Sequence, residues 1–383
     1  MQLFKRLFPS AAKVYADWEH LVSLFRLARP AYSLTTNVIL LVIYTLTVVR
    51  IGFAALAGWQ PAFAFGSSLA RSGNTAPFII ALCCSAYSPA PVFRLIIMLL
   101  QPRDRFALMQ AITEGTGRQE RQAKIRLMRA VYLLLTAACL MAVVSCEGLM
   151  MSMACINVWQ SESFMEALAW ICWSAQDLAI VGIMSADLVF FPGTWILLAL
   201  DYRMDLLLLI QEINAAAKAP AHASVQQMSD ALERLLMKAD ILNAWSGILF
   251  FLTLATTATA CLDVYIVSHS DNVFFRVLLP FAGVAVVCTA SFLMALAGNI
   301  TAASERLHTS LSSLACRSRH ATSVREKRLL LLMLEETGCA EQRLALYTLT
   351  GNKYTPESFV AFLIETALHY TLLLSFSSFA ASV

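Results

Sequence analysis

Long apolar stretches separated by short polar ones dominate the chain. Seven windows of about 20 residues or more are apolar enough to cross a lipid bilayer, at residues 34–58, 76–100, 129–153, 167–200, 242–268, 274–300 and 357–379. A helix rises about 1.5 Å per residue, so each window can span a hydrocarbon core of roughly 30 Å. The pattern predicts an all-α membrane protein, with seven transmembrane helices in one domain over residues 1–383.

Basic residues predict the orientation of these helices. If the N-terminus is cytoplasmic, 24 of the 28 Lys and Arg residues fall on the inner side, and only Arg71 and Arg276 fall outside. Positively charged loops stay in the cytoplasm, so the C-terminus is predicted to be extracellular, the reverse of a G-protein-coupled receptor. Residues 1–33 are amphipathic and basic, and we interpret them as a cytoplasmic helix of a multi-pass plasma-membrane protein.

Composition excludes several other classes of protein. The chain is 59% apolar and 14% charged, against roughly 25% charge in soluble domains. Its net charge of +3 does not indicate nucleic-acid binding, because the basic residues lie at the ends of apolar windows. The ten cysteines fall mostly inside those windows, without metal-binding or disulfide spacing. No catalytic motif is present, so we expect no enzyme activity, cofactor or metal.

Helices are predicted to extend from the membrane into the cytoplasm. The fourth apolar run is interrupted by Phe191-Pro192-Gly193 and continues as a polar-edged helix to Asn214. A second cytoplasmic helix begins at Ser224, and the sixth window continues toward Leu314. The helix after Ser224 has one apolar stripe, made of Met228, Leu232, Leu235, Ala239 and Leu242, and four charged residues off it, Asp230, Glu233, Arg234 and Lys238. These extensions predict a helical platform whose apolar stripes pack among themselves or against other subunits.

The last helix is predicted over 356–380. Thr355-Pro356-Glu357 combines an N-cap hydroxyl, a first-turn proline and an acid at the positive end of the helix dipole. Gly351 is suited to the left-handed stop of the preceding helix. One face carries Thr366, Tyr370, Leu373 and Ser377, and the opposite side carries Phe362, Leu372, Phe376 and Phe379. A hydroxyl-bearing face favours either close helix packing or the lining of a pore.

Ionisable residues inside the windows are candidates for function. Ser88-Pro89-Ala90-Pro91 must kink the second helix, and Arg94 follows it. Arg94 either extends to the inner interface or pairs with an acid, first Glu365 and second Asp187.

A group of acids, aromatics and methionines is predicted nearer the outer side. Its members are Phe78, Glu147, Met150, Met151, Trp170, Trp173, Asp177, Asp263 and Tyr265. Aromatic walls with a few polar groups suit a small-molecule pocket. Interfacial aromatics and interhelical hydrogen bonds are the alternative explanation for each residue taken alone.

Four short motifs, in this order and spacing, resemble the insect gustatory and odorant receptor superfamily across essentially the whole chain. They are Gln101-Pro102-Arg103-Asp104-Arg105-Phe106, Leu200-Asp201-Tyr202-Arg203-Met204-Asp205-Leu206, Leu242-Asn243-Ala244-Trp245 and Thr350-Gly351-Asn352-Lys353-Tyr354-Thr355. The superfamily signature in the last helix is Thr-Tyr, five apolar residues, then Gln-Phe. The stretch from His369 to Ser377 keeps the tyrosine and lacks the threonine and the glutamine.

The resemblance implies a tetrameric, ligand-gated, non-selective cation channel of gustatory type. It implies a homotetramer, or a heterotetramer with a co-receptor, held together by the cytoplasmic platform. Each subunit contributes its last helix to a central pore, and a small molecule binds among spans two to six. Carried onto this chain, the pore and gate residues are Tyr370, Leu373, Phe376 and Ser377.

Two other functions are consistent with parts of the sequence. A receptor-like protein without a conducting pore, acting as a partner subunit or in a non-sensory role, is favoured by the missing glutamine. A secondary transporter is suggested by broken helices and intramembrane acids, but the sequence has no visible inverted repeat.

Overall fold

The computed structural model describes residues 38–50 apart from 40 and 48, 122–218, 225–243, 246, 273–317, 323–339, 344–347 and 351–380. Its named helices are α7 (Gln122–Trp159), α8 (Phe164–Lys218), α10 (Val273–Arg317), α11 (Val324–Cys339) and α13 (Pro356–Ala380). Residues 38–50 and 225–243 are also helical wherever they are described. Within these ranges the only strand-like feature is an isolated antiparallel bridge between Tyr347 and Lys353. The prediction of a helical fold is therefore confirmed, and the seven-span topology stays a prediction.

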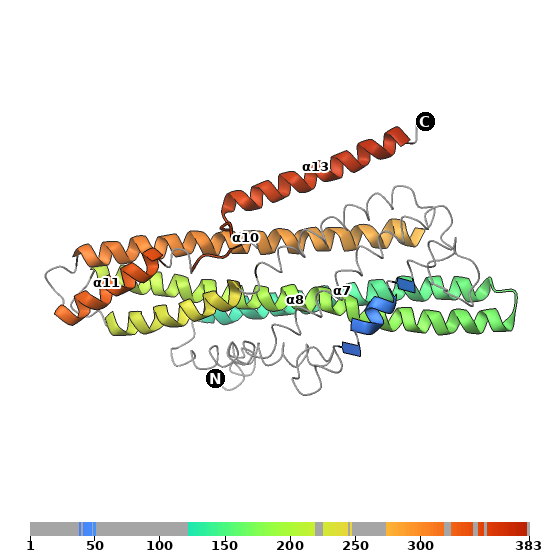
Figure 1. The fold of residues 1–383 in the computed structure, drawn as a ribbon, viewed down its shortest axis with the longest axis horizontal. Helices are drawn as coiled ribbons and strands as arrows, with labels where there is room; N and C mark the ends of the chain where they lie inside the picture. Colours follow the sequence, from blue (N-terminus) through green and yellow to red (C-terminus); the bar gives the residue numbers. More distant parts are fainter. Residues whose placement is uncertain are drawn as a thin grey trace.

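The helices α7 and α8 form a long antiparallel hairpin (Figure 1). Its turn is held by capping bonds, in which Ser163 Oγ accepts from Glu166 N at 3.1 Å and Glu166 Oε2 accepts from Glu162 N at 3.0 Å. We call the end of the molecule at this turn the hairpin end, and the opposite end, where α11 lies, the distal end (Figure 1).

The predicted interruption of the fourth apolar run is wrong. The helix α8, which has 55 residues in all, continues without a break through Pro192 and Gly193. Proline removes one backbone hydrogen bond, to the carbonyl four residues earlier. The turns that follow are held by packing, since Trp195, Ile196, Leu197 and Leu200 are all buried. At 1.5 Å per residue α8 is about 80 Å long, well beyond the thickness of a bilayer.

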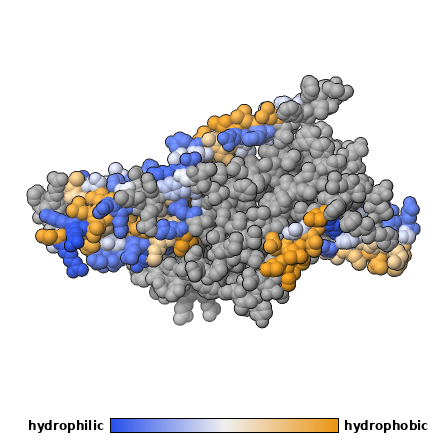
Figure 2. All heavy atoms as spheres, viewed as in Figure 1, coloured by the Kyte–Doolittle hydropathy of each residue, from blue (hydrophilic) through white to orange (hydrophobic). Residues whose placement is uncertain are grey.

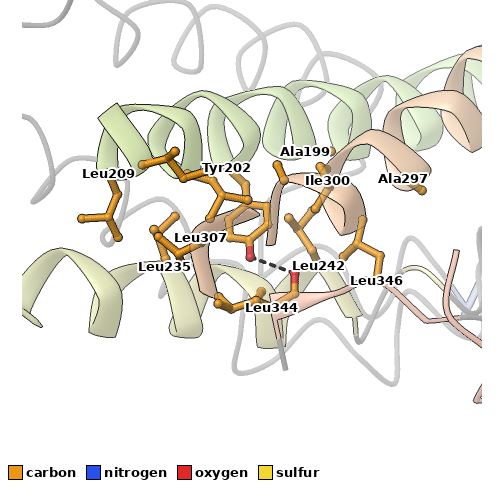
Figure 3. Packing of buried hydrophobic residues seen from close by; sticks show 14 of the residues in the cluster. Ala199, Tyr202, Leu209, Leu235, Leu242, Ala297, Ile300, Leu307, Leu344 and Leu346 are labelled. Carbon is orange, nitrogen blue, oxygen red and sulfur yellow. Dashed lines mark hydrogen bonds between the residues drawn. The ribbon is translucent and has the colours of Figure 1, made fainter. Parts of the chain in front are cut away.

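The buried core lies in the distal half. It is formed by the second half of α8, the helix 225–243, and α10 from Ala290 to Leu314, with α11 against them (Figure 3). The stripe predicted on the helix after Ser224 is confirmed, since all five of its members are buried. One neighbour was assigned wrongly: Lys238 is also buried, although the helical spacing predicted it off the stripe.

The hairpin half has the opposite pattern, with large apolar side chains facing outward. On α7 these exposed residues are Leu127, Leu133, Leu134, Leu140, Met141, Val144, Met151 and Trp159. From Leu133 to Met151 they recur mostly every seven residues, two helical turns, and this stretch covers about 27 Å of the helix axis. Figure 2 shows further apolar residues on the 38–50 helix and on the first turns of α13. Among the described residues, one stretch, Val287–Arg317, meets the length and composition criteria for crossing a membrane.

The last helix, α13, leaves the body of the molecule from the middle of α10 (Figure 1). Its final buried side chain among those described is Phe362. Beyond that point every described side chain except the half-buried Thr366 is exposed, including Leu363, Ile364, Leu368 and Leu372. A 25-residue apolar helix thus lies largely uncovered by its own chain.

Candidate functional site

The start of α13 has the predicted local chemistry. Thr355 Oγ1 accepts from Ser358 N at 3.2 Å, and Ser358 Oγ accepts from Thr355 N at 3.2 Å, which is a reciprocal cap of the first turn. Pro356 occupies the first helical position, where its missing N–H removes no hydrogen bond. Thr355 is therefore confirmed as the N-cap, and the helix bounds of 356–380 are confirmed.

Hydroxyl groups along α13 are satisfied within the helix. Thr366, Thr371 and Ser375 each donate to the carbonyl four residues earlier, at 2.8, 2.7 and 2.8 Å. Their hydrogen atoms are used locally and their oxygen lone pairs remain available. Thr371 and Ser375 lie one turn apart on one side of the helix and Thr366 lies on the opposite side. Each can face water or the same helix of another copy without an unsatisfied donor.

The predicted pore and gate residues all lie on this helix. Tyr370 is 39% exposed. Leu373, Phe376 and Ser377 lie on the last turns of α13, where the structure describes the backbone and not these side chains. Glu365 is exposed, and its proposed partner Arg94 lies outside the described residues.

A partly buried segment leads into α13, and we call it the strap: residues 344–347 and 351–355. Its first part is clamped by side chains from two other helices. Tyr202 of α8 donates to Leu344 O at 2.9 Å (Figure 3). Asn243 donates to Ala345 O at 2.8 Å and accepts from Tyr347 N at 3.0 Å. Ser246 donates to Tyr347 O at 2.6 Å. The clamp thus satisfies strap backbone groups that are buried away from water.

Gly351 was predicted to end the preceding helix, and that role is wrong. The helix α11 ends earlier, at Cys339, and Gly351 lies in the turn between the bridged residues Tyr347 and Lys353. Its φ of 79° is left-handed, which explains the glycine. The bond from Tyr354 N to Leu346 O, 2.9 Å long, closes the turn.

The ionisable groups around the strap are held in one protonation state. Burial raises the pKa of Tyr354, and burial together with the charge of Asp240 raises the pKa of Tyr202, so both hydroxyls stay protonated donors. Lys238 Nζ lies 2.7 Å from Asp201 Oδ2 and 2.6 Å from Asp205 Oδ2. Burial lowers the pKa of Lys238, but attraction to the two carboxylates outweighs this effect and raises it. This triad joins α8 to the helix 225–243 beside the clamp.

At the hairpin end, the structure brings together an arginine and a predicted pocket residue. The guanidinium of Arg50 lies 4.7 Å from the ring centroid of Trp173, and the arginine is 7% exposed. Such a cation–π contact contributes on the order of 0.5–2 kcal/mol, more when desolvated. Trp170, one turn away, is 3% exposed and donates to Glu166 at 3.4 Å. This region thus combines a buried and a half-buried tryptophan with a buried arginine on one ring and a glutamate on the other.

The other predicted pocket residues are placed differently. Glu147 is half-buried on α7, and Met151 is 57% exposed. Met150 and Asp177 lie on α7 and α8, with only their backbone described. Three residues, Phe78, Asp263 and Tyr265, lie outside the described residues.

Sequence reasoning missed three buried polar residues of this region. Arg50 lies inside the apolar window 34–58, and the sequence analysis assigned it no partner. Two buried polar residues, Asn157 and Ser174, lie on the same hairpin and were not singled out. The available signal was the same for all three: a polar side chain surrounded by apolar residues at helical spacing.

Comparison with known proteins gives a match in structure but none in sequence. No protein-family model and no curated protein matches the sequence. Among solved structures, the fold is similar to that of the insect olfactory receptor OR5 from Machilis hrabei, solved in complex with eugenol. The TM-score is 0.51 at 13% sequence identity, and the match covers 87% of this chain and 88% of the receptor. The chain therefore has a fold like that of an insect olfactory receptor over most of its length.

Proposed function

We propose that this protein is a chemosensory receptor of the plasma membrane that acts as a ligand-gated cation channel. A small molecule opens it, and α13 lines the pore in an assembly of four subunits, either identical or including a co-receptor. The proposal extends a shared fold to a shared function, so it depends on features of this chain that suit a channel.

The main supporting observation is the exposure of α13. A helix of 25 residues is about 37 Å long, enough to cross a hydrocarbon core. It is fastened at its first two turns and exposed beyond Phe362, and it combines apolar residues with several hydroxyls. A helix of this kind is completed by several copies of itself around an axis, where the hydroxyls face water and the apolar side faces neighbouring helices or lipid.

The division of the molecule into two halves supports a membrane location. Exposed apolar side chains along about 27 Å of α7 match the thickness of a hydrocarbon core. The distal half has a buried apolar core and buried ion pairs, as a water-exposed body does. The Lys and Arg distribution of the sequence supports a cytoplasmic location for that half. Seven spans, with an extracellular C-terminus after α13, complete the proposed topology.

The cluster of Arg50, Trp170 and Trp173 is the best-supported part of the proposed ligand region. Glu147 lies on the neighbouring helix α7, 12 residues before its end at Trp159, and Asp177 lies 13 residues after the start of α8 at Phe164, so both acids are farther from the hairpin turn than the two tryptophans. Buried aromatics with a few charges provide surface for a small organic ligand and a means of orienting it. Eugenol, the compound in the olfactory-receptor structure, is a reasonable first compound to test in a broader panel.

Two variants that introduce opposite charges at the gate residue Leu373 test the proposed function. We expect cells that express the chain alone to show a cation current when a panel of small molecules is applied. Leu373→Lys should abolish that current, because four positive charges would repel cations in the pore. Leu373→Glu introduces a side chain of similar size and opposite sign, and it should retain or increase the current. Surface labelling of both variants serves as the expression control.

The alternative function predicts a different result. If the chain is a partner subunit without its own pore, the two variants will behave alike, and no current will appear without a second subunit. Equal currents from Leu373→Lys and Leu373→Glu at equal surface expression would contradict the proposal that Leu373 lines the pore.

A further inference from the structure

The backbone of α10 touches the strap directly at one residue. Gly298 is buried, and a Cβ atom added there would lie 3.0 Å from both the carbonyl carbon and the oxygen of Thr355. It would also lie 3.1 Å from Pro356 N. All three contacts are with the peptide bond that begins α13, so no flexible side chain can move aside. Only glycine fits at this crossing without moving the start of the helix.

The strap is held from other directions as well. The clamp residues Tyr202, Asn243 and Ser246 fix its first part by hydrogen bonds of 2.6–3.0 Å. After the turn, Tyr354 is 4% exposed and donates from its backbone to Leu346 O. The Thr355–Pro356 peptide is therefore fixed between this clamp and the bare backbone of Gly298.

The path of α13 beyond this crossing depends on very few contacts. Of its described side chains only Phe362 is buried, about 10 Å along the helix from Thr355. Ser377 lies a further 15 residues on, about 22 Å from Phe362. A displacement at Thr355 is accordingly about doubled at Ser377 if the helix turns about Phe362 as a rigid rod.

We propose that Gly298 is a positioning residue that sets the angle at which α13 leaves α10. This role deepens the proposed function, because the pore-level residues 373–377 lie on the free part of that helix. The Cβ atom of an alanine at position 298 would lie 3.0 Å from Thr355 O, whereas an ordinary contact needs at least 3.4 Å. The strap must therefore move away by about 0.4 Å. The doubled displacement at residue 377 is about 1 Å.

Gly148→Ala is the matched control for Gly298→Ala. Both glycines are in helices, so both variants gain the same helix propensity, but a Cβ at Gly148 meets nothing within 4 Å. Electron-microscopy maps of the purified full chain would be superposed on α10. We expect residue 377 to be displaced by about 1 Å in Gly298→Ala and to stay in place in Gly148→Ala.

Hydrogen exchange gives a second measurement that needs no channel activity. The amides of Tyr347 and Tyr354 are bonded within the clamped strap, so we expect them to exchange at least threefold faster in Gly298→Ala than in the unaltered chain. Unchanged exchange together with an unmoved helix would overturn the proposal. A chain that conducts no ions under any condition would refute the proposed function. The position of residue 377 and the exchange rates would still test the role of Gly298.

If Gly298→Ala does not fold, a variant of the clamp residue Asn243 tests whether the strap is held as proposed. Asn243→Asp loses the donor to Ala345 O and keeps the acceptor for Tyr347 N, so it should loosen the strap and accelerate exchange at Tyr354. Asn299→Asp is its control, because Asn299 is exposed and donates to Ala295 O of its own helix. Equal exchange at Tyr354 in these two variants would contradict the proposal.

Discussion

Replacing Lys238 by methionine tests the account of the distal body most severely. The lysine ammonium lies 2.7 and 2.6 Å from the carboxylates of Asp201 and Asp205 and joins α8 to the helix 225–243. Methionine fills a similar volume and removes the charge. Asp201, whose side chain is 5% exposed, would then be a buried carboxylate without its cation.

The cost of that change has a lower and an upper bound. Breaking a buried ion pair by removing one partner destabilises proteins by about 3–5 kcal/mol. Asp201 can avoid an unpaired charge by taking up a proton, which costs about 4 kcal/mol at pH 7 for an ordinary aspartate pKa of about 3.9. Asp205 is 28% exposed and can be hydrated, so it adds little. We therefore expect a loss of about 3–4 kcal/mol in the free energy of unfolding.

The assay is thermal unfolding of the purified full chain, followed by tryptophan fluorescence. A loss of this size lowers the Tm by roughly 6–16 °C, at 2–4 °C for each kcal/mol. Arg234→Met, one turn earlier on the same helix and exposed, is the control and should leave the Tm nearly unchanged. Adding Asp201→Asn to Lys238→Met removes the unpaired charge, so the double variant should regain part of the lost stability.

Two results would refute this reasoning. One is a Tm for Lys238→Met within about 2 °C of the unaltered chain, which would mean that the triad is too well hydrated to matter. The other is a double variant less stable than Lys238→Met, which would show that the cost does not come from an isolated carboxylate.

Three further outcomes follow from the same region. Tyr202→Phe leaves the buried Leu344 carbonyl without its donor and should lower the free energy of unfolding by about 1–3 kcal/mol, measured from the Tm. Gly351→Ala must adopt a φ of 79° and should cost about 1–2 kcal/mol, whereas the same change at Gly148 should be neutral or stabilising by differential scanning fluorimetry. Because the folded-state pKa of Lys238 is raised, its contribution is fully present below the ordinary value of 10.5 and is lost as pH rises beyond it. The Tm difference between the unaltered chain and Lys238→Arg should accordingly stay constant from about pH 7 to pH 10 and change only above that range.

Local patterns allowed correct predictions wherever the deciding contacts are close in sequence. The N-cap at Thr355 is set by a residue three positions away, and the stripe from Met228 to Leu242 by helical spacing. The length of α10 beyond its apolar window was predicted for the same reason, since no helix breaker interrupts it before Leu314. Each of these depends on one helix and its immediate ends.

Predictions failed where a distant partner changes the role of a residue. The helical spacing predicts Lys238 to be a solvent-exposed charge. It is buried because it binds Asp201, which lies 37 residues earlier in the sequence. Gly351 was correctly chosen for a left-handed position, but the bridge between Tyr347 and Lys353 makes it a turn residue and not a helix stop. Pro192 was expected to break α8, and packing of the following turns keeps the helix continuous.

The proposed ligand region shows how far residue types alone can lead. Trp170 and Trp173 were singled out as aromatics at one height, and both lie in a buried or half-buried cluster. The arginine that stacks on Trp173 comes from a helix more than 100 residues earlier, so no local pattern could pair them. Glu147 and Asp177 were also singled out from the sequence, whereas the distant cation is recognisable as the partner of Trp173 only once the helices are packed.

Electron microscopy of the purified full chain, with subunits counted around any symmetry axis, tests the central claim most directly. The account predicts four copies with α13 as the helix nearest the axis, and Tyr370 closer to that axis than any residue of α7. An assembly in which α13 faces lipid at the periphery, or a particle containing a single chain, would contradict it.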